Sequence, residues 1–139
     1  RLVVLEQSWR IALERVPADG VVRLPLAPVL AVSEVRVFDA GGSAGVVAPA
    51  DWRLETRADP AKVILAGAAL EATGGLEIDL TAGYGAAPEA APAPLVQAIR
   101  LLAAHWFEHR GDGPPQMEKA SLPLDVAALV APFRRLRMG

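Results

Sequence analysis

The stretch from Leu76 to Arg110, LEIDLTAGYGAAPEAAPAPLVQAIRLLAAHWFEHR, decides the fold. It begins with apolar and polar side chains that alternate from Leu76 to Thr81, which is the pattern of a half-buried β-strand. A glycine turn around Tyr84 and a proline-rich connector then lead into an apolar segment with helical spacing. The stretch therefore predicts a strand, a turn, a connector and one long apolar helix in an α+β fold.

The first half of the chain has the pattern of a small β domain, with short strands separated by turn residues. Trp9, Ile11 and Leu13 alternate with Arg10 and Ala12, and the turn residues PADG then end this strand. Gly and Pro divide the following sequence into further short strands, expected at 21–24, 32–38, 52–55 and 62–66, and a loop, expected at 39–45. Residues 1–85 are therefore predicted to form an antiparallel β-sheet or sandwich.

Residues 86–94 contain three prolines in nine residues and are predicted to connect the sheet to a helix. As an extended polyproline arm, this connector would span up to about 28 Å at about 3.1 Å per residue. A surface loop is the alternative interpretation. Pro94 is expected to open the helix, because the first helical position needs no N–H donor. Residues 95–139 are then predicted to form a helical segment that packs on the sheet within one compact domain overall.

The predicted helix is apolar around most of its circumference. Its main stripe consists of Leu95, Ala98, Ile99, Leu102 and Trp106. The flanks add Val96, Ala103 and Phe107 on one side and Leu101 and His105 on the other. A helix with so little polar surface should be covered on more than one side, either by another subunit or by a C-terminal helix lying over Phe107. The residues predicted for a subunit interface are Val96, Leu101, His105 and Phe107. Trp9, Tyr84 and Trp106 are predicted to be structural residues, with the tryptophans as core anchors.

A second, shorter helix is expected between Leu122 and Leu136, and Pro132 should kink or split it by removing one backbone hydrogen bond. Several arginines follow. They either complement the dipole of the last helical turn or form a contact for an acidic partner surface. The candidate interface residues in this segment are Phe133, Arg134, Arg135, Leu136 and Arg137.

Composition limits the classes of function. The chain has 139 residues, which suits one domain with one core, and its 53% hydrophobic content provides apolar faces for subunit contacts. A net charge of −2 does not indicate the basic surface of a nucleic-acid-binding protein, so we do not expect the protein to bind DNA that lies near it. Without cysteine there is no disulfide or thiolate site. No apolar run approaches the roughly 20 residues of a membrane helix, and no membrane contact is predicted.

One motif suggests a metal site. His105, Glu108 and His109 fit the pattern H-x-x-E-H, in which two histidines bind zinc and the glutamate acts as a base. A catalytic zinc site also needs a third protein ligand, and only Asp112, Glu118 and Asp125 follow as carboxylates. The aromatic residues between the histidines favour a packed helix end, so a zinc metalloprotease is the minor alternative. No phosphate-binding loop or nucleophile elbow is present, and we predict no enzyme activity, no metal and no cofactor.

Six segments carry a resemblance to a known family when taken in order. They are QSW at 7–9, LPLAPVLAVSEVRVFD at 24–39, DWRL at 51–54, LTAGYG at 80–85, HWFEHR at 105–110 and LP..V..LV.PFR at 122–134. Together they resemble the head–tail connector, or adaptor, proteins of tailed phages. Phage-derived gene transfer agents use similar adaptors, and the composition of this chain, with only two lysines, fits a GC-rich bacterial source of that kind.

The resemblance implies a structural function. Such adaptors form a ring, commonly dodecameric, that lies beneath the portal protein, joins it to stopper or tail proteins and surrounds a DNA channel. The expected location is the neck of a virion or phage-like particle assembled in the bacterial cytoplasm. In the family a helical part precedes the region that this sequence resembles, so the sequence is expected to be the later part of a longer polypeptide. The residues alone leave open a monomeric accessory binding module or a tail-completion protein.

Overall fold

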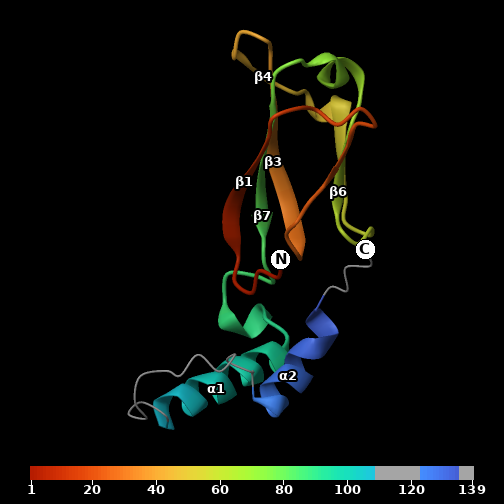
Figure 1. The fold of residues 1–139 in the computed structure, drawn as a ribbon. Helices are drawn as coiled ribbons and strands as arrows, with labels where there is room; N and C mark the ends of the chain where they lie inside the picture. The colour runs from red at the N-terminus through yellow and green to blue at the C-terminus, as the bar shows by residue number, and fades with distance from the viewer. Residues whose placement is uncertain (109–122, 135–139) are drawn as a thin grey trace. The chain divides into compact units, whose positions relative to one another are not determined.

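The computed structural model describes residues 1–108 and 123–134 (Figure 1). The chain forms two compact units, Arg1–Ala86 and Ala87–Gly139, and the boundary between them falls in the proline-rich stretch of the sequence. The first unit is built from strands and the second from helices. The α+β class predicted from the sequence is confirmed.

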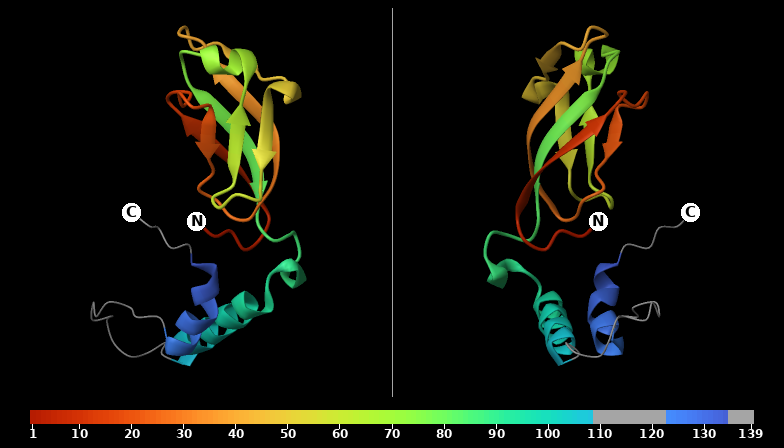
Figure 2. Two further views of the ribbon diagram at one scale, coloured as in Figure 1. Left: turned by 90° about the vertical axis from the view of Figure 1, so that its right-hand side faces the viewer. Right: turned by 60° about the vertical axis from the view of Figure 1, so that its left-hand side comes forward.

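The β unit contains two antiparallel sheets (Figure 2). The first sheet has the strand order β1 (Gln7–Leu13), β7 (Leu76–Ala82), β3 (Val29–Phe38) and β4 (Ala44–Val46). The second has the order β2 (Val21–Arg23), β6 (Lys62–Leu65) and β5 (Trp52–Glu55). Two short 3-10 helices, Pro49–Asp51 and Gly67–Glu71, lie in the connections. Strand β7 is central because β1 and β3 pair with its two edges.

Both sheets contribute to one hydrophobic core. On β7, Leu76 and Ile78 are 0% exposed and Leu80 is 2% exposed, whereas the residues between them are only half-buried. The second sheet adds Val22 and Val63 to the same core cluster. The alternation in LEIDLT therefore sorts side chains between the inner and outer faces as predicted, and the unit is a β-sandwich.

The third predicted strand is longer and its loop shorter than expected. Strand β3 begins at Val29, directly after Pro28, and its pairing with β7 contains two register shifts. The loop predicted at 39–45 contains the start of β4, which pairs with the end of β3. The Asp39 carboxylate accepts hydrogen bonds from the backbone N–H groups of Gly41 and Ser43, at 2.8 and 2.9 Å. This Asx-type turn reverses the chain within a few residues, so β4 begins before the end of the predicted loop.

The glycine turn after β7 lies against the beginning of the chain. The N–H of Gly83 donates to the Pro28 carbonyl, and the N–H of Glu6 donates to the Gly85 carbonyl, each at 2.9 Å. Gly83 has a φ of 131°, and a Cβ atom placed there would lie 2.5 Å from the Leu5 carbonyl oxygen. Only glycine allows the two backbones to approach this closely.

The second unit contains the helices α1 (Ala93–Glu108) and α2 (Leu124–Val130), which contact each other. A 3-10 turn, Pro88–Ala90, precedes α1, so residues 86–94 do not form one extended polyproline arm. Helix α1 begins one residue before Pro94, which still lies in its first turn. Helix α2 ends at Val130 and passes into a 3-10 turn, Ala131–Phe133, so the α-helix is interrupted beside Pro132, where the sequence predicts a kink or a split.

Helix α1 is not covered as the sequence led us to expect. Its buried residues are Leu95 and Ala98, and α2 contributes the buried Val126. The main-stripe residues Ile99 and Trp106 are instead 55% and 64% exposed. The prediction that Trp106 is a core anchor is therefore wrong for this chain, because an exposed side chain leaves no cavity when it is truncated. Trp9, in contrast, is half-buried against the core of the β unit.

Candidate interaction surfaces

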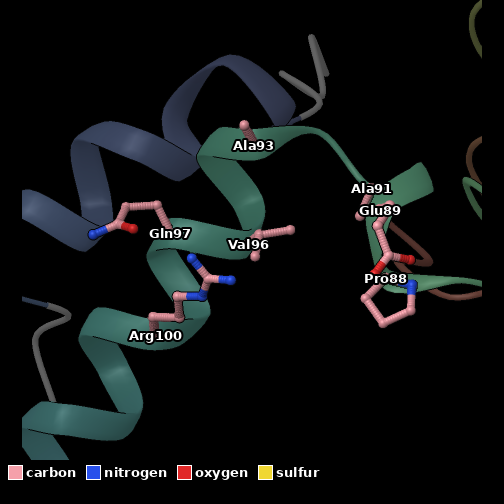
Figure 3. A pocket seen from close by; sticks show the side chains of 7 residues that line it. All are labelled: Pro88, Glu89, Ala91, Ala93, Val96, Gln97 and Arg100. Carbon is pink, nitrogen blue, oxygen red and sulfur yellow. The ribbon is translucent and has the colours of Figure 1, made fainter.

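An open groove lies between the first turns of α1 and the proline-marked segment before it (Figure 3). Its volume is about 410 Å³. The residues that line it are Pro88, Glu89, Ala91, Ala93, Val96, Gln97 and Arg100. Figure 3 shows that Val96 projects from α1 toward the Pro88–Ala91 segment. The groove therefore combines small apolar walls with the amide of Gln97 and one charged side chain of each sign, Glu89 and Arg100.

The other end of α1 presents aromatic side chains to solvent. Trp106 is 64% exposed and Phe107 is 70% exposed, and the carboxylate-bearing Glu108 follows them as an exposed residue. We call these three residues the aromatic end. Exposed aromatic side chains that lie together are unusual on a monomer and typically mark a contact with another molecule.

The residues predicted for an interface occupy different environments. On α1, Val96 lines the groove, Leu101 and His105 are half-buried, and Phe107 belongs to the aromatic end. After α2, Phe133 is half-buried and Arg134 is exposed. The remaining predicted residues, Arg135, Leu136 and Arg137, lie outside the described residues. Tyr84 is half-buried in the glycine turn, where its N–H donates to the Val4 carbonyl.

The outer face of the four-stranded sheet carries a network of ion pairs. Arg10 on β1 donates from Nε and Nη2 to the two carboxylate oxygens of Asp79 on β7, at 2.7 and 3.0 Å. From the other side, Arg36 on β3 donates to Asp79 at 2.6 Å and lies 3.4 Å from Glu77. Glu34 also pairs with Arg36. Because its charges are matched within one chain, this face is a poor candidate for an apolar subunit contact.

The network changes how its members titrate. Hydrogen bonds from Arg10 and then Arg36 hold the pKa of the Asp79 carboxyl below its usual value, against the opposing effect of desolvation. The same contact with Asp79 raises the pKa of Arg10. In the second sheet, the hydrogen bond from Lys62 lowers the pKa of Glu55. Each of these shifts favours the charged forms that the folded state pairs.

We therefore expect the β unit to lose stability in acid. The folded pKa of Asp79 is depressed below the unfolded value of about 3.9, so its contribution is present above that value and is lost as the pH falls through the folded pKa. Thermal unfolding between neutral pH and pH 2 should show this loss. Asp79→Asn should be less stable at neutral pH and should lose less on acidification. If Asp79→Asn and the exposed-site control Glu14→Gln have the same profiles, the network does not stabilise the fold.

Three solved structures are similar to this chain over 99% of its length. One is the neck of an empty gene transfer agent (GTA) particle computed with C6 symmetry, with 35% identity, a TM-score of 0.79 and 70% of that chain covered. The second is the neck of a native GTA particle computed with C12 symmetry, with 35% identity, a TM-score of 0.79 and 74% covered. The third is the virion of a native GTA particle, with 36% identity, a TM-score of 0.77 and 70% covered.

The chain belongs to the head–tail adaptor family. The identity and the almost complete coverage of the chain establish this, and they confirm the resemblance drawn from the six sequence segments. No protein-family model and no curated protein matches the chain. Members of this family are structural components of the particle neck.

The metal-ligating side chains in the part of the adaptor that the structure describes do not gather at one place. Among residues 1–108 and 123–134, no three His, Cys, Asp or Glu side chains gather closely enough to hold a metal ion. His109, one of the two histidines in the H-x-x-E-H pattern, lies outside these residues. Helix α1 places His105 and Glu108 in its last turn, beside Trp106 and Phe107. Within the same described ranges, no helix has the length and hydropathy needed to cross a membrane.

Sequence reasoning did not identify every residue at these surfaces. Helical spacing alone gives Arg100 no partner and no role, although it lines the groove of the adaptor. The Arg10–Asp79–Arg36 network was also missed. A signal for it exists, since acidic residues on the outer face of β7 match arginines on two other strands, but only the strand register places them opposite one another.

Proposed function

We propose that this adaptor is the repeated subunit of a ring in the neck of a GTA or phage-like particle. The ring, commonly dodecameric in this family, joins the portal protein to the stopper or tail proteins, and DNA passes through its lumen without specific binding. The subunit acts as a structural part and not as an enzyme, and it assembles in the bacterial cytoplasm. The observation that carries this proposal is the 35% identity, over 99% of the chain, to necks computed with C6 and C12 symmetry.

The charge and the surfaces of the chain support this function. A net charge of −2 gives a DNA-surrounding ring little attraction for phosphates, so the DNA remains free to move through it. A cyclic ring needs two different contact surfaces on each subunit. Helix α1 offers exposed apolar residues for such contacts, and the edge strand β4 of the sandwich exposes Val46.

We assign the docking contact with the portal to the C-terminal segment from Phe133 to Arg137. Phe133 ends a 3-10 turn and is half-buried, and the exposed Arg134 follows it. An aromatic side chain followed by arginines has the composition of an interaction hot spot. The arginines would meet an acidic surface of the portal.

Imaging of particles that contain this chain tests the proposal. We expect the necks to show copies of the chain arranged around the particle axis, in contact with the portal on one side and with the stopper or tail proteins on the other. Density for the chain elsewhere in the particle, or as a single copy at the neck, would refute the ring.

Phe133→Asp tests the docking assignment. We expect particles carrying this variant to accumulate heads without tails, because burying an unpaired carboxylate at the portal contact costs several kcal/mol. The measurement is the fraction of joined particles in electron micrographs. Leu124→Asp, at a residue of α2 that is 87% exposed, is the matched control and should join heads to tails normally. The thermal unfolding of both variants identifies any loss of folding, and normal joining by a folded Phe133→Asp would refute the docking assignment.

A further inference from the structure

The groove and the aromatic end are both on α1, but at different positions along the helix. Val96 and Trp106 are ten residues apart, which corresponds to about 15 Å along the helix axis. At 3.6 residues per turn, Trp106 and Arg100 also project about 120° apart around the axis. The aromatic end of one chain therefore cannot enter the groove on its own helix. An aromatic end that fills this groove must belong to another copy of the chain.

The aromatic end can fill the groove, and its carboxylate has a cationic partner there. The groove offers about 410 Å³ between small apolar residues, and the aromatic end offers the exposed indole of Trp106. The groove carries one charge of each sign, from Arg100 and Glu89, and Glu108 beside Trp106 is negative; all three side chains are exposed. Glu108 therefore has to lie on the Arg100 side of the groove, away from Glu89. An arginine in this position can pair with the carboxylate and also lie over the indole ring.

We propose that the aromatic end of each subunit binds in the groove of the next subunit around the ring. This inference rests on the ring proposed above. The contact joins two different surfaces, so it is heterologous and can be repeated around a closed ring. An aromatic side chain buries about 150–250 Å². Two of them supply about half of the roughly 800 Å² that each partner contributes to a stable interface, so the portal and the remaining ring contacts must supply the rest.

The absence of cysteine from the chain provides a clean crosslinking test. Ala93→Cys places a thiol in the groove, and Ala103→Cys places one a turn before the aromatic end, both at exposed positions. The two sites are about 15 Å apart along one helix, so a crosslinker shorter than this distance cannot join them within a chain. Particles assembled with the double variant should give a ladder of covalent oligomers. Particles with either single variant should not.

The crosslinking outcomes separate this inference from the proposed function. If imaging shows neck rings but the double variant gives no ladder, the groove contact is wrong and the ring proposal stands. A ladder from a single-cysteine variant would indicate that like surfaces meet, which also overturns the groove contact. If no ring of this chain exists at the neck, the proposed function fails and this inference fails with it.

A charge exchange provides a second measurement. Arg100→Glu alone and Glu108→Arg alone should each reduce the fraction of particles with complete necks about tenfold, because like charges then meet across the contact. The double variant should restore complete necks. Neither residue is buried, so we expect all three variants to unfold at nearly the temperature of the unchanged chain. Folded single variants with normal necks, or a double variant no better than the single ones, would refute the contact.

Discussion

Ile78→Asp is expected to unfold the β unit. Ile78 is 0% exposed at the middle of β7, and strands β1 and β3 pair with both edges of that strand. Losing the isoleucine side chain costs about 2–5 kcal/mol, and burying an unpaired carboxylate costs several kcal/mol more. Together these losses match the total stability of about 5–15 kcal/mol that is typical of a domain. Circular dichroism should show the loss of β structure at 25 °C.

Thr81→Asp is the matched control for this prediction. It introduces the same carboxylate three residues later on the same strand, but on the outer face, where Thr81 is only half-buried. We expect this variant to remain folded, with a change in unfolding free energy of about 1 kcal/mol or less. If Ile78→Asp remained folded with a similarly small change, the core face of β7 would be assigned to the wrong side.

Gly83→Ala is expected to destabilise the β unit by about 3 kcal/mol or more. Two causes add at this position. A residue with a side chain is strained at a φ of 131°, which costs about 1–3 kcal/mol. The new Cβ atom would also lie 2.5 Å from the Leu5 carbonyl oxygen and 2.6 Å from the Glu6 nitrogen, so the segment that leads into β1 would have to move away from the glycine turn. Urea unfolding monitored by tryptophan fluorescence measures the change in free energy.

Gly42→Ala separates the two causes. Gly42 also has a positive φ, of 82°, but a Cβ atom added there would have no other heavy atom within 4 Å. Its substitution should therefore cost only about 1–2 kcal/mol, which is the penalty for the left-handed conformation. Equal losses for the two variants would show that the close approach of Leu5 and Glu6 does not constrain the glycine turn.

Much of the β unit follows from local sequence pattern. Successive side chains on a strand point to opposite faces, whatever the rest of the chain does. The segment LEIDLT therefore predicts both the strand and its buried residues, and the structure confirms them. Turn chemistry was harder to predict in detail. Asp39 closes its turn through two backbone N–H groups, and the loop around it is therefore shorter than a stretch of Gly and Ser suggests.

The interaction surfaces could be predicted only in part. Helical spacing identifies α1 and shows that it has more apolar surface than one neighbour can cover, but it does not show which side the neighbour takes. Packing within the chain buries Leu95 and Ala98 and leaves Ile99 and Trp106 exposed, although the sequence places all four in one stripe. A stripe wider than the contact between two helices leaves this choice to the tertiary structure.

The amino-acid sequence by itself determined the element types, the inner face of β7, the interruption of the second helix near Pro132 and, through six ordered segments, the adaptor family. These properties depend on neighbours in the chain, on backbone geometry and on common descent. Only the tertiary structure decided that Arg10 and Arg36 meet at Asp79 and that a groove opens beside Val96. For the ion pairs the physical reason is distance along the chain, because residues far apart in sequence meet only once the strand register is set. The residues of the groove are close in sequence, but the path that Pro88–Ala91 takes beside α1 depends on the three-dimensional backbone.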